Sequence, residues 1–372
     1  MLERLRAAPQ TNETGLLYIS SLDGLRLLAF LAVFIHHLPV SMAFLGMEAF
    51  QRRGWVGVEL FFVISAFLFF HLFEAEVRKA GFIDVKRFYL RRFLRIYPLM
   101  VAFPAAMIIW TGAYTKDAIF RLVGLMAGAD NLVTAFDGYS PIPFSPQLWT
   151  LSFEFQIYLV IPFAFLAYQK YGTRRFLIGA AIVWGLCTLL RIAAVLSGVG
   201  YLPAWVLPFL RPDSVLLGML LSIFVKHIPP LYALAAGLGA ASGFFALPLM
   251  EQSATSQILV FPAAAIMCGA LVALAHSWRP LGRVLSLRWA TFAGTISFGL
   301  YVFHVFGIYL AGNLLERFGV DPSTASAAAC VALTAVAFAA TFAMAAASYM
   351  GFERPFLKLK DRFAAVHGRP AV

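Results

Sequence analysis

The sequence predicts an all-α membrane protein, a bundle of about ten transmembrane helices with both termini in the cytoplasm. Of the 372 residues, 61% are hydrophobic and only 13% are charged, and the mean hydropathy is +0.82. Soluble domains carry about 25% charged residues. Apolar stretches near the roughly 20 residues needed to cross hydrocarbon recur along the chain, and basic residues gather in alternate connections. The lipid bilayer is therefore the expected environment.

Ten apolar segments are expected to cross the membrane. Ten crossings bring both termini to the same side, and that side should carry the excess of lysine and arginine if it is cytoplasmic. The basic runs 78–95, 170–175, 279–288 and 354 onward all fall there. The predicted segments, in chain order, are 22–44, 55–73, 96–112, 149–168, 175–196, 205–225, 229–249, 256–276, 290–311 and 325–350.

This pattern divides the chain into a cytoplasmic N-terminal segment 1–21, a transmembrane domain 22–355 and a cytoplasmic tail 356–372. The longest connection on the opposite side, about 113–148, contains Pro141, Pro143 and Pro146. Proline favours extended or turn conformations over a continuing helix. We expect this connection to form a lid over a cavity.

The formal charge of +11 does not indicate a nucleic-acid partner. The basic residues lie in connections between apolar segments, and no basic aromatic stripe lies outside them. Cys187, Cys268 and Cys330 each fall inside an apolar run, where a free thiol acts as a small buried hydrophobe. Their spacing indicates neither a disulfide framework nor a metal site.

Arg26 and His37 are the first candidates for chemistry, because ionisable residues inside a bilayer are costly and mark functional sites. At 100° per residue, the step from Arg26 to His37 ends about 20° beyond three full turns and rises roughly 16 Å. The two side chains therefore share a helix face, whereas His36 lies about 80° away. We predict that His37 faces inward; a snorkelling contact or a helix-to-helix hydrogen bond is the structural alternative.

Glu154 is the next candidate. It lies in the segment 149–168 with Ser152, and Tyr158 follows it at i, i+4 spacing. A carboxylate here could orient a histidine, as carboxylates orient the base at other acyl-transfer sites. A hydrogen bond between helices without a catalytic role is the alternative.

Further polar residues are expected to line the same interior. Arg211 and Asp213 could contact a substrate or could simply neutralise one another. The remaining predicted cavity-lining residues, besides Ser152 and Tyr158, are Asp23, Ser65, Tyr301 and His304.

Arg91, Arg92 and Arg95 form a dense guanidinium cluster on the cytoplasmic side. Guanidinium groups match phosphate geometry, so the cluster could clamp the phosphates of a nucleotide-bearing donor. The topological charge bias or attraction to anionic lipid explains the same residues without a ligand.

Taken together, these residues resemble the acyltransferase-3 family of membrane-bound O-acyltransferases over nearly the whole chain. Ala66 and Phe298 depart from the family pattern, where glycine and tyrosine are usual. The hallmark, arginine and histidine with ten residues between them, corresponds to Arg26 and His37. The other matching motifs are 61–65, 92–95, 148–154, 211–213, 297–304 and 353–355.

The resemblance implies acyl-CoA, commonly acetyl-CoA, as donor and co-substrate, with no bound cofactor and no metal. The implied acceptor is a hydroxyl of a saccharide or lipid-linked glycan, and the implied location is the plasma (inner) membrane. Many relatives carry an extracytoplasmic domain, whereas we expect only the transmembrane acyltransferase domain here. His37 would be the base, Arg26 would stabilise developing charge or donor phosphates, and Glu154 would orient partners.

A proton-coupled secondary transporter of a polar solute is the alternative function. An intramembrane set of histidine, arginine and carboxylates also serves proton pathways. The paired broken helices typical of such transporters are not evident in two matching halves of the sequence. A non-catalytic scaffold would leave the alignment of Arg26 with His37 without purpose.

Overall fold

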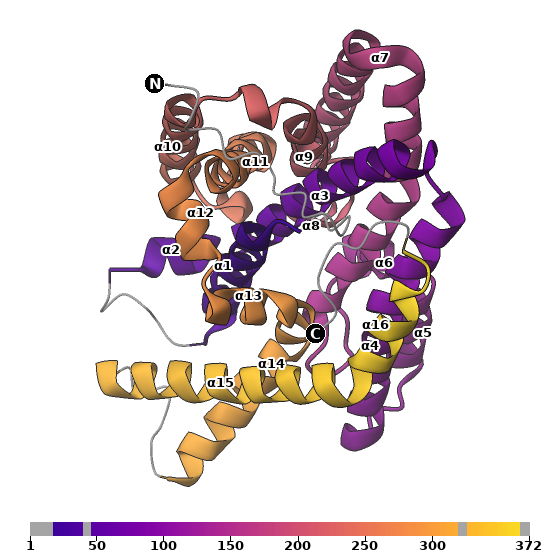
Figure 1. Cartoon of the computed structure of the whole chain (residues 1–372). Coiled ribbons are helices and arrows are strands. Elements are labelled where there is room, and N and C mark those ends of the chain that lie inside the picture. Colours follow the sequence, from indigo (N-terminus) through magenta and orange to yellow (C-terminus); the bar gives the residue numbers. More distant parts are fainter. Residues whose placement is uncertain (1–17, 40–45, 319–325, 365–372) are drawn as a thin grey trace.

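The computed structural model describes residues 18–39, 46–318 and 326–364, and every regular element in these ranges is helical (Figure 1). Six helical stretches there are long and apolar enough to span a membrane. They are Val56–Ala80, Val85–Thr111, Pro146–Leu196, Ala254–Ser277, Ser297–Arg317 and Ala327–Asp361. The predicted all-α, multi-pass membrane fold is confirmed.

The expected segments 149–168 and 175–196 are joined in one element, α7 (Trp149–Leu196). Gly172 interrupts it with a φ of 75°, and Figure 1 shows α7 folding back on itself. Glycine adopts such a φ without the steric penalty of a Cβ atom. One element therefore accounts for two predicted crossings.

The expected segment 205–225 is broken rather than continuous. It forms α8 (Tyr201–Val206) and α9 (Asp213–Phe224), with non-helical backbone between them. Pro208 and Pro212 lie in the break, and proline removes the backbone donor that a continuing helix needs. The break places Arg211 in a connection inside the bundle rather than on a helix face.

The first expected segment, 22–44, is shorter in the structure. Helix α1 (Ser20–His37) ends at His37, and residues 40–45 lie outside the described part of the chain. The other long helices of the bundle are α3 (Val56–Ala80), α4 (Val85–Thr111), α11 (Ala254–Ser277), α14 (Ser297–Arg317) and α15 (Ala327–Ser348). Shorter elements are α2 (Glu48–Arg53), α10 (Pro230–Ala246), α12 (Arg279–Leu285) and α13 (Arg288–Thr295).

Helix α1 packs against its neighbours at backbone distance. A Cβ atom added to Gly57 of α3 would collide with the Ala29 carbonyl of α1, and one added to Gly294 of α13 would collide with the backbone of Asp23. Small residues at helix interfaces permit this close approach in membranes. The position of α1 is thereby set from two sides.

The connection 113–148 contains two helices that the sequence analysis did not predict, α5 (Lys116–Met126) and α6 (Asp130–Asp137). An ion pair of 2.6 Å between Arg121 and Asp130 joins them. Burial raises the pKa of Asp130 to about 6, against the opposing effect of Arg121. The proline-rich stretch after α6 is non-helical, as expected, up to the 3₁₀ turn η3 (Pro146–Leu148).

The C-terminal helix α16 (Arg354–Asp361) follows α15 after a π turn at Tyr349–Glu353 and packs on α4. Arg91 of α4 donates a 2.8 Å hydrogen bond to the carbonyl of Phe363 and lies 3.6 Å from the carboxylate of Glu76. The predicted tail 356–372 thus begins inside a packed helix; its residues 365–372 lie outside the described range.

Candidate active site

Two cavities lie against α1. The first, which we call the arginine cavity, has a volume of about 80 Å³. Five helices supply its polar lining: α1, α3, α4, α7 and α14. The polar side chains are Arg26, Ser65, Arg92, Arg95, Thr150, Glu154, Tyr158, Ser297 and Tyr301. Seven of these nine positions were singled out by the sequence analysis as site residues, and the other two, Thr150 and Ser297, lie in quoted motifs.

Glu154 accepts hydrogen bonds inside the arginine cavity. Tyr158, one turn along α7, donates to it, and Ser65 of α3 donates to it across 3.3 Å. The i, i+4 contact expected from the sequence is present. The expected contact with a histidine is not, because Glu154 lines the arginine cavity whereas His36 and His37 line the other one.

The arginines of the cluster on α4 separate into two groups. Arg92 and Arg95 line the arginine cavity, and the Arg92 guanidinium lies 4.5 Å from the ring centroid of Phe69. Arg91 instead binds Phe363 and Glu76, as described above, and is not among the lining residues. The structure therefore gives Arg91 a role in holding α16, which its sequence neighbourhood could not reveal.

Arg26 borders the same cavity and forms a 2.8 Å ion pair with Asp23, one turn earlier on α1. The hydroxyl of Tyr18 also donates to Asp23. Asp23 is buried behind Arg26 and does not line either cavity, so it holds the arginine rather than facing a ligand.

The second cavity, which we call the histidine cavity, has a volume of about 640 Å³, within the usual range for small-molecule sites. His36 and His37 of α1 lie in its wall. The expected lid contributes Tyr139, Pro146 and Gln147. The wall also contains polar and aromatic residues that the sequence analysis did not single out, among them Gln51, Arg52, Arg53, Trp55, Tyr201, Trp205 and Glu251.

His37 is exposed to this cavity, and its Nδ1 lies 2.9 Å from the Val33 carbonyl. Because a carbonyl can only accept, Nδ1 carries the proton in the neutral ring and Nε2 keeps a lone pair. The Nδ1 of His36 lies 2.9 Å from the Gln51 carbonyl, so the same assignment holds there. The helical wheel separated the two histidines, whereas the structure places both in one cavity.

His304 lies directly behind His37, with ring centroids 4.8 Å apart. It is fully buried and is not a lining residue of either cavity. Its Nδ1 lies 2.6 Å from the Tyr301 carbonyl. His304 therefore supports the ring of His37 from the protein side.

The two cavities meet at a shared wall formed by Val58, Thr150 and Tyr301, each of which lines both. The hydroxyls of Thr150 and Tyr301 lie 2.8 Å apart, and each donates to the Gln147 carbonyl, over 2.9 and 3.2 Å. Arg26 and His37 face the same side of α1, one in each cavity. The site thus consists of two chambers, one lined by arginines and the other by histidines, and three residues line both.

The acyltransferase-3 family model, described as an acyltransferase domain, matches residues 19–345. The chain belongs to this family. It resembles the peptidoglycan O-acetyltransferase OatA of Listeria monocytogenes, with 29% identity over 41% of this chain and 25% of that protein. It also resembles a putative peptidoglycan O-acetyltransferase, YrhL, of Bacillus subtilis, with 24% identity over 80% of this chain and 50% of that protein.

A putative O-acetyltransferase of Staphylococcus aureus strain COL is 30% identical over 45% of this chain and 28% of its own length. The chain therefore spans a quarter to a half of the length of these curated relatives. No solved structure matches the chain.

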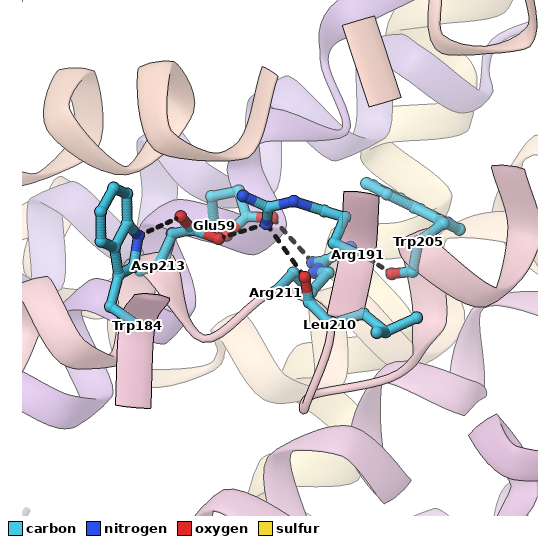
Figure 2. A network of polar contacts seen from close by, with 8 residues as sticks. Glu59, Trp184, Arg191, Trp205, Leu210, Arg211 and Asp213 are labelled. Carbon is cyan, nitrogen blue, oxygen red and sulfur yellow. Dashed lines mark hydrogen bonds and ion pairs between the residues drawn. The ribbon is translucent and has the colours of Figure 1, made fainter. Parts of the chain in front are cut away.

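Figure 2 shows a second group of charged residues. None of them lines either of the two cavities. Arg211 pairs with Glu59 of α3 across 2.8 Å, and Arg191 of α7 pairs with Asp213 across 2.7 Å. The expected neutralisation of Arg211 by Asp213 is thus replaced by two pairs, each of which joins different parts of the bundle. Arg191 was missed by the sequence analysis.

Arg211 is also enclosed by aromatic rings and donates to the Trp205 carbonyl. Its guanidinium lies 4.4 Å from the ring centroid of Trp205. Four more rings lie within 6 Å, those of Phe62, Trp149, Phe153 and Phe261.

Ser152, another predicted lining residue, is fully buried and accepts a 3.2 Å hydrogen bond from the Asp130 amide. These residues hold the bundle together around the chambers.

Proposed function

We propose that this chain is a membrane-bound O-acyltransferase of the plasma (inner) membrane. It moves an acyl group, in our proposal acetyl, from acyl-CoA to a hydroxyl of a saccharide or lipid-linked glycan. One observation carries the proposal: the arginine cavity and the histidine cavity meet at Val58, Thr150 and Tyr301. Two substrates that enter from the two chambers would come into contact there.

The donor belongs to the arginine cavity in this proposal. Arg92 and Arg95 offer guanidinium groups suited to the phosphates of coenzyme A. A volume of about 80 Å³ admits only the thioester end of such a molecule, so its nucleotide would remain at the cytoplasmic surface. Arg26 lies where it could stabilise the charge that develops on the thioester oxygen.

The acceptor belongs to the histidine cavity. Its wall combines Trp55, Trp149 and Trp205 with polar groups such as Glu251, a mixture of flat apolar faces and hydrogen-bonding groups that suits a sugar. The names of the Listeria and Bacillus relatives, which refer to peptidoglycan, support a glycan acceptor.

His37 would act as the base. Its Nε2 accepts the proton of the acceptor hydroxyl while the hydroxyl oxygen attacks the thioester carbonyl. The C–S bond then breaks, the coenzyme A thiolate leaves and takes the proton, and an ester forms on the acceptor. In the alternative, covalent route, the same nitrogen would carry the acyl group as an intermediate.

The test is a transfer assay with purified protein, radiolabelled acetyl-CoA and peptidoglycan fragments as acceptors. We expect label on the glycan in a molar amount equal to the free thiol released, and acetylated His37 only if the covalent route operates. Folded protein that transfers no label to any glycan would contradict the proposal. Proton-driven uptake of a polar solute into vesicles by such protein would favour the transporter instead.

A further inference from the structure

The wall between the two chambers is closely packed and internally bonded. Val58, Thr150 and Tyr301 are 6%, 5% and 7% exposed. Gln147 ties the wall to α14 through a 3.0 Å hydrogen bond from its side-chain amide to the Val302 carbonyl, and its own carbonyl accepts from both wall hydroxyls. The wall is therefore a packed and hydrogen-bonded boundary between the two chambers.

The chambers on its two sides differ about eightfold in volume, 80 against 640 Å³. A donor that enters the small chamber thioester first brings its acyl group to the wall, because His37 lies on the far side. The acyl group must therefore fit among the side chains of Val58, Thr150 and Tyr301 at the moment of transfer. This step rests on the proposed function.

We infer that Val58, Thr150 and Tyr301 form a length filter that admits a two-carbon acyl group and rejects longer ones. A packed protein interior yields little to an added methylene, since extra volume forces side chains off their rotamers. One methylene in an apolar pocket changes enzymatic discrimination by roughly 10 to 200-fold. The filter thus names short-chain acyl-CoA as the donor class.

The filter can be opened without loss of its hydroxyls. Val58→Ala removes two methyl groups from the wall, and Thr150→Ser removes one and keeps the hydroxyl that donates to Gln147. Val260→Ala is the matched control, because Val260 is 1% exposed and lines only the histidine cavity. It loses the same atoms as Val58→Ala in an equally buried position of the larger chamber.

The experiment compares kcat/KM for acetyl-, propionyl- and butyryl-CoA with one glycan acceptor in purified wild-type protein and the three variants. We expect the wild type to favour acetyl over butyryl by about 100-fold or more, as two methylenes imply. Val58→Ala and Thr150→Ser should raise the butyryl-to-acetyl ratio by roughly 10-fold, whereas Val260→Ala should leave it unchanged.

Equal use of the three donors by the wild type would overturn the filter and leave the proposed transferase intact. So would an equal shift of the ratio in Val58→Ala and Val260→Ala. A wild type that transfers no acyl group would overturn the proposed function and the filter together. If Val58→Ala does not fold in detergent, the smaller change Thr150→Ser decides.

Discussion

The chain embeds two groups of charged residues that look alike in sequence but differ in their surroundings. Arg211 and Arg191 each have a carboxylate partner within 2.8 Å and are at most 1% exposed. Arg92 and Arg95 instead line the arginine cavity. A charged side chain inside a membrane protein can thus either join helices to one another or line a cavity that could hold a ligand. The position of the side chain at a cavity, rather than its charge, distinguishes the two groups.

The largest effect is expected from Arg211→Met, which leaves Glu59 buried without its partner. Removing one member of a buried pair typically costs about 3–5 kcal/mol. We expect a large drop in melting temperature in detergent and a low yield of folded protein. A second change, Glu59→Gln, should recover part of the loss. If Arg211→Met keeps the normal melting temperature but loses acyl transfer, Arg211 would instead belong to the ligand-binding residues.

The next effect separates the two histidines of the histidine cavity. His37→Ala should lower acyl transfer by about 10² to 10⁴-fold, the usual contribution of a general base. His36→Ala should retain most activity, because the His37 ring lies against His304 and is more exposed than the His36 ring. Both variants should reach normal abundance in the membrane, since removing a polar group lowers the insertion cost. If His36→Ala loses acyl transfer while His37→Ala keeps it, His36 rather than His37 would be the base.

The smallest effect concerns the arginines of α4. Arg92→Gln and Arg95→Gln should each weaken acetyl-CoA binding by roughly 10-fold or more, as expected for loss of a charge-assisted hydrogen bond. Arg91→Gln is the control, because its guanidinium already binds Phe363 and Glu76. Titration calorimetry with non-hydrolysable acetyl-CoA measures all three. If Arg91→Gln weakens acetyl-CoA binding as much as the other two variants do, Arg91 cannot be separated from Arg92 and Arg95 in donor binding.

Much of the fold was predictable from the sequence because hydropathy reports each crossing locally. The expected crossings correspond to helices, apart from the break around Arg211, the division of segment 290–311 between α13 and α14, and the residues outside the described ranges. The fold-back of α7 at Gly172 falls between two of the expected crossings. The helices α5 and α6 were not predicted. The ion pair of Arg121 with Asp130 that joins them is a contact that no local pattern records.

The site was predictable where spacing along one helix decides the geometry. The i, i+4 contact of Tyr158 with Glu154 and the common side of Arg26 and His37 follow from helical periodicity. The pairing of Arg211 with Glu59 spans distant parts of the chain. The division of the interior into two chambers likewise depends on side-chain packing between helices, which a single sequence does not encode legibly.

The glycine contacts of α1 bear on how the chambers could open. Gly57 and Gly294 bring neighbouring backbones so close to α1 that even a methyl group would not fit. A helix in such close contact cannot rotate about its axis or shift along it without breaking these backbone contacts on both sides. We therefore expect helix α1 to keep its position relative to its neighbours. Any gap that forms between donor and acceptor must come from the parts that face it, Tyr301 on α14 and the stretch that carries Gln147.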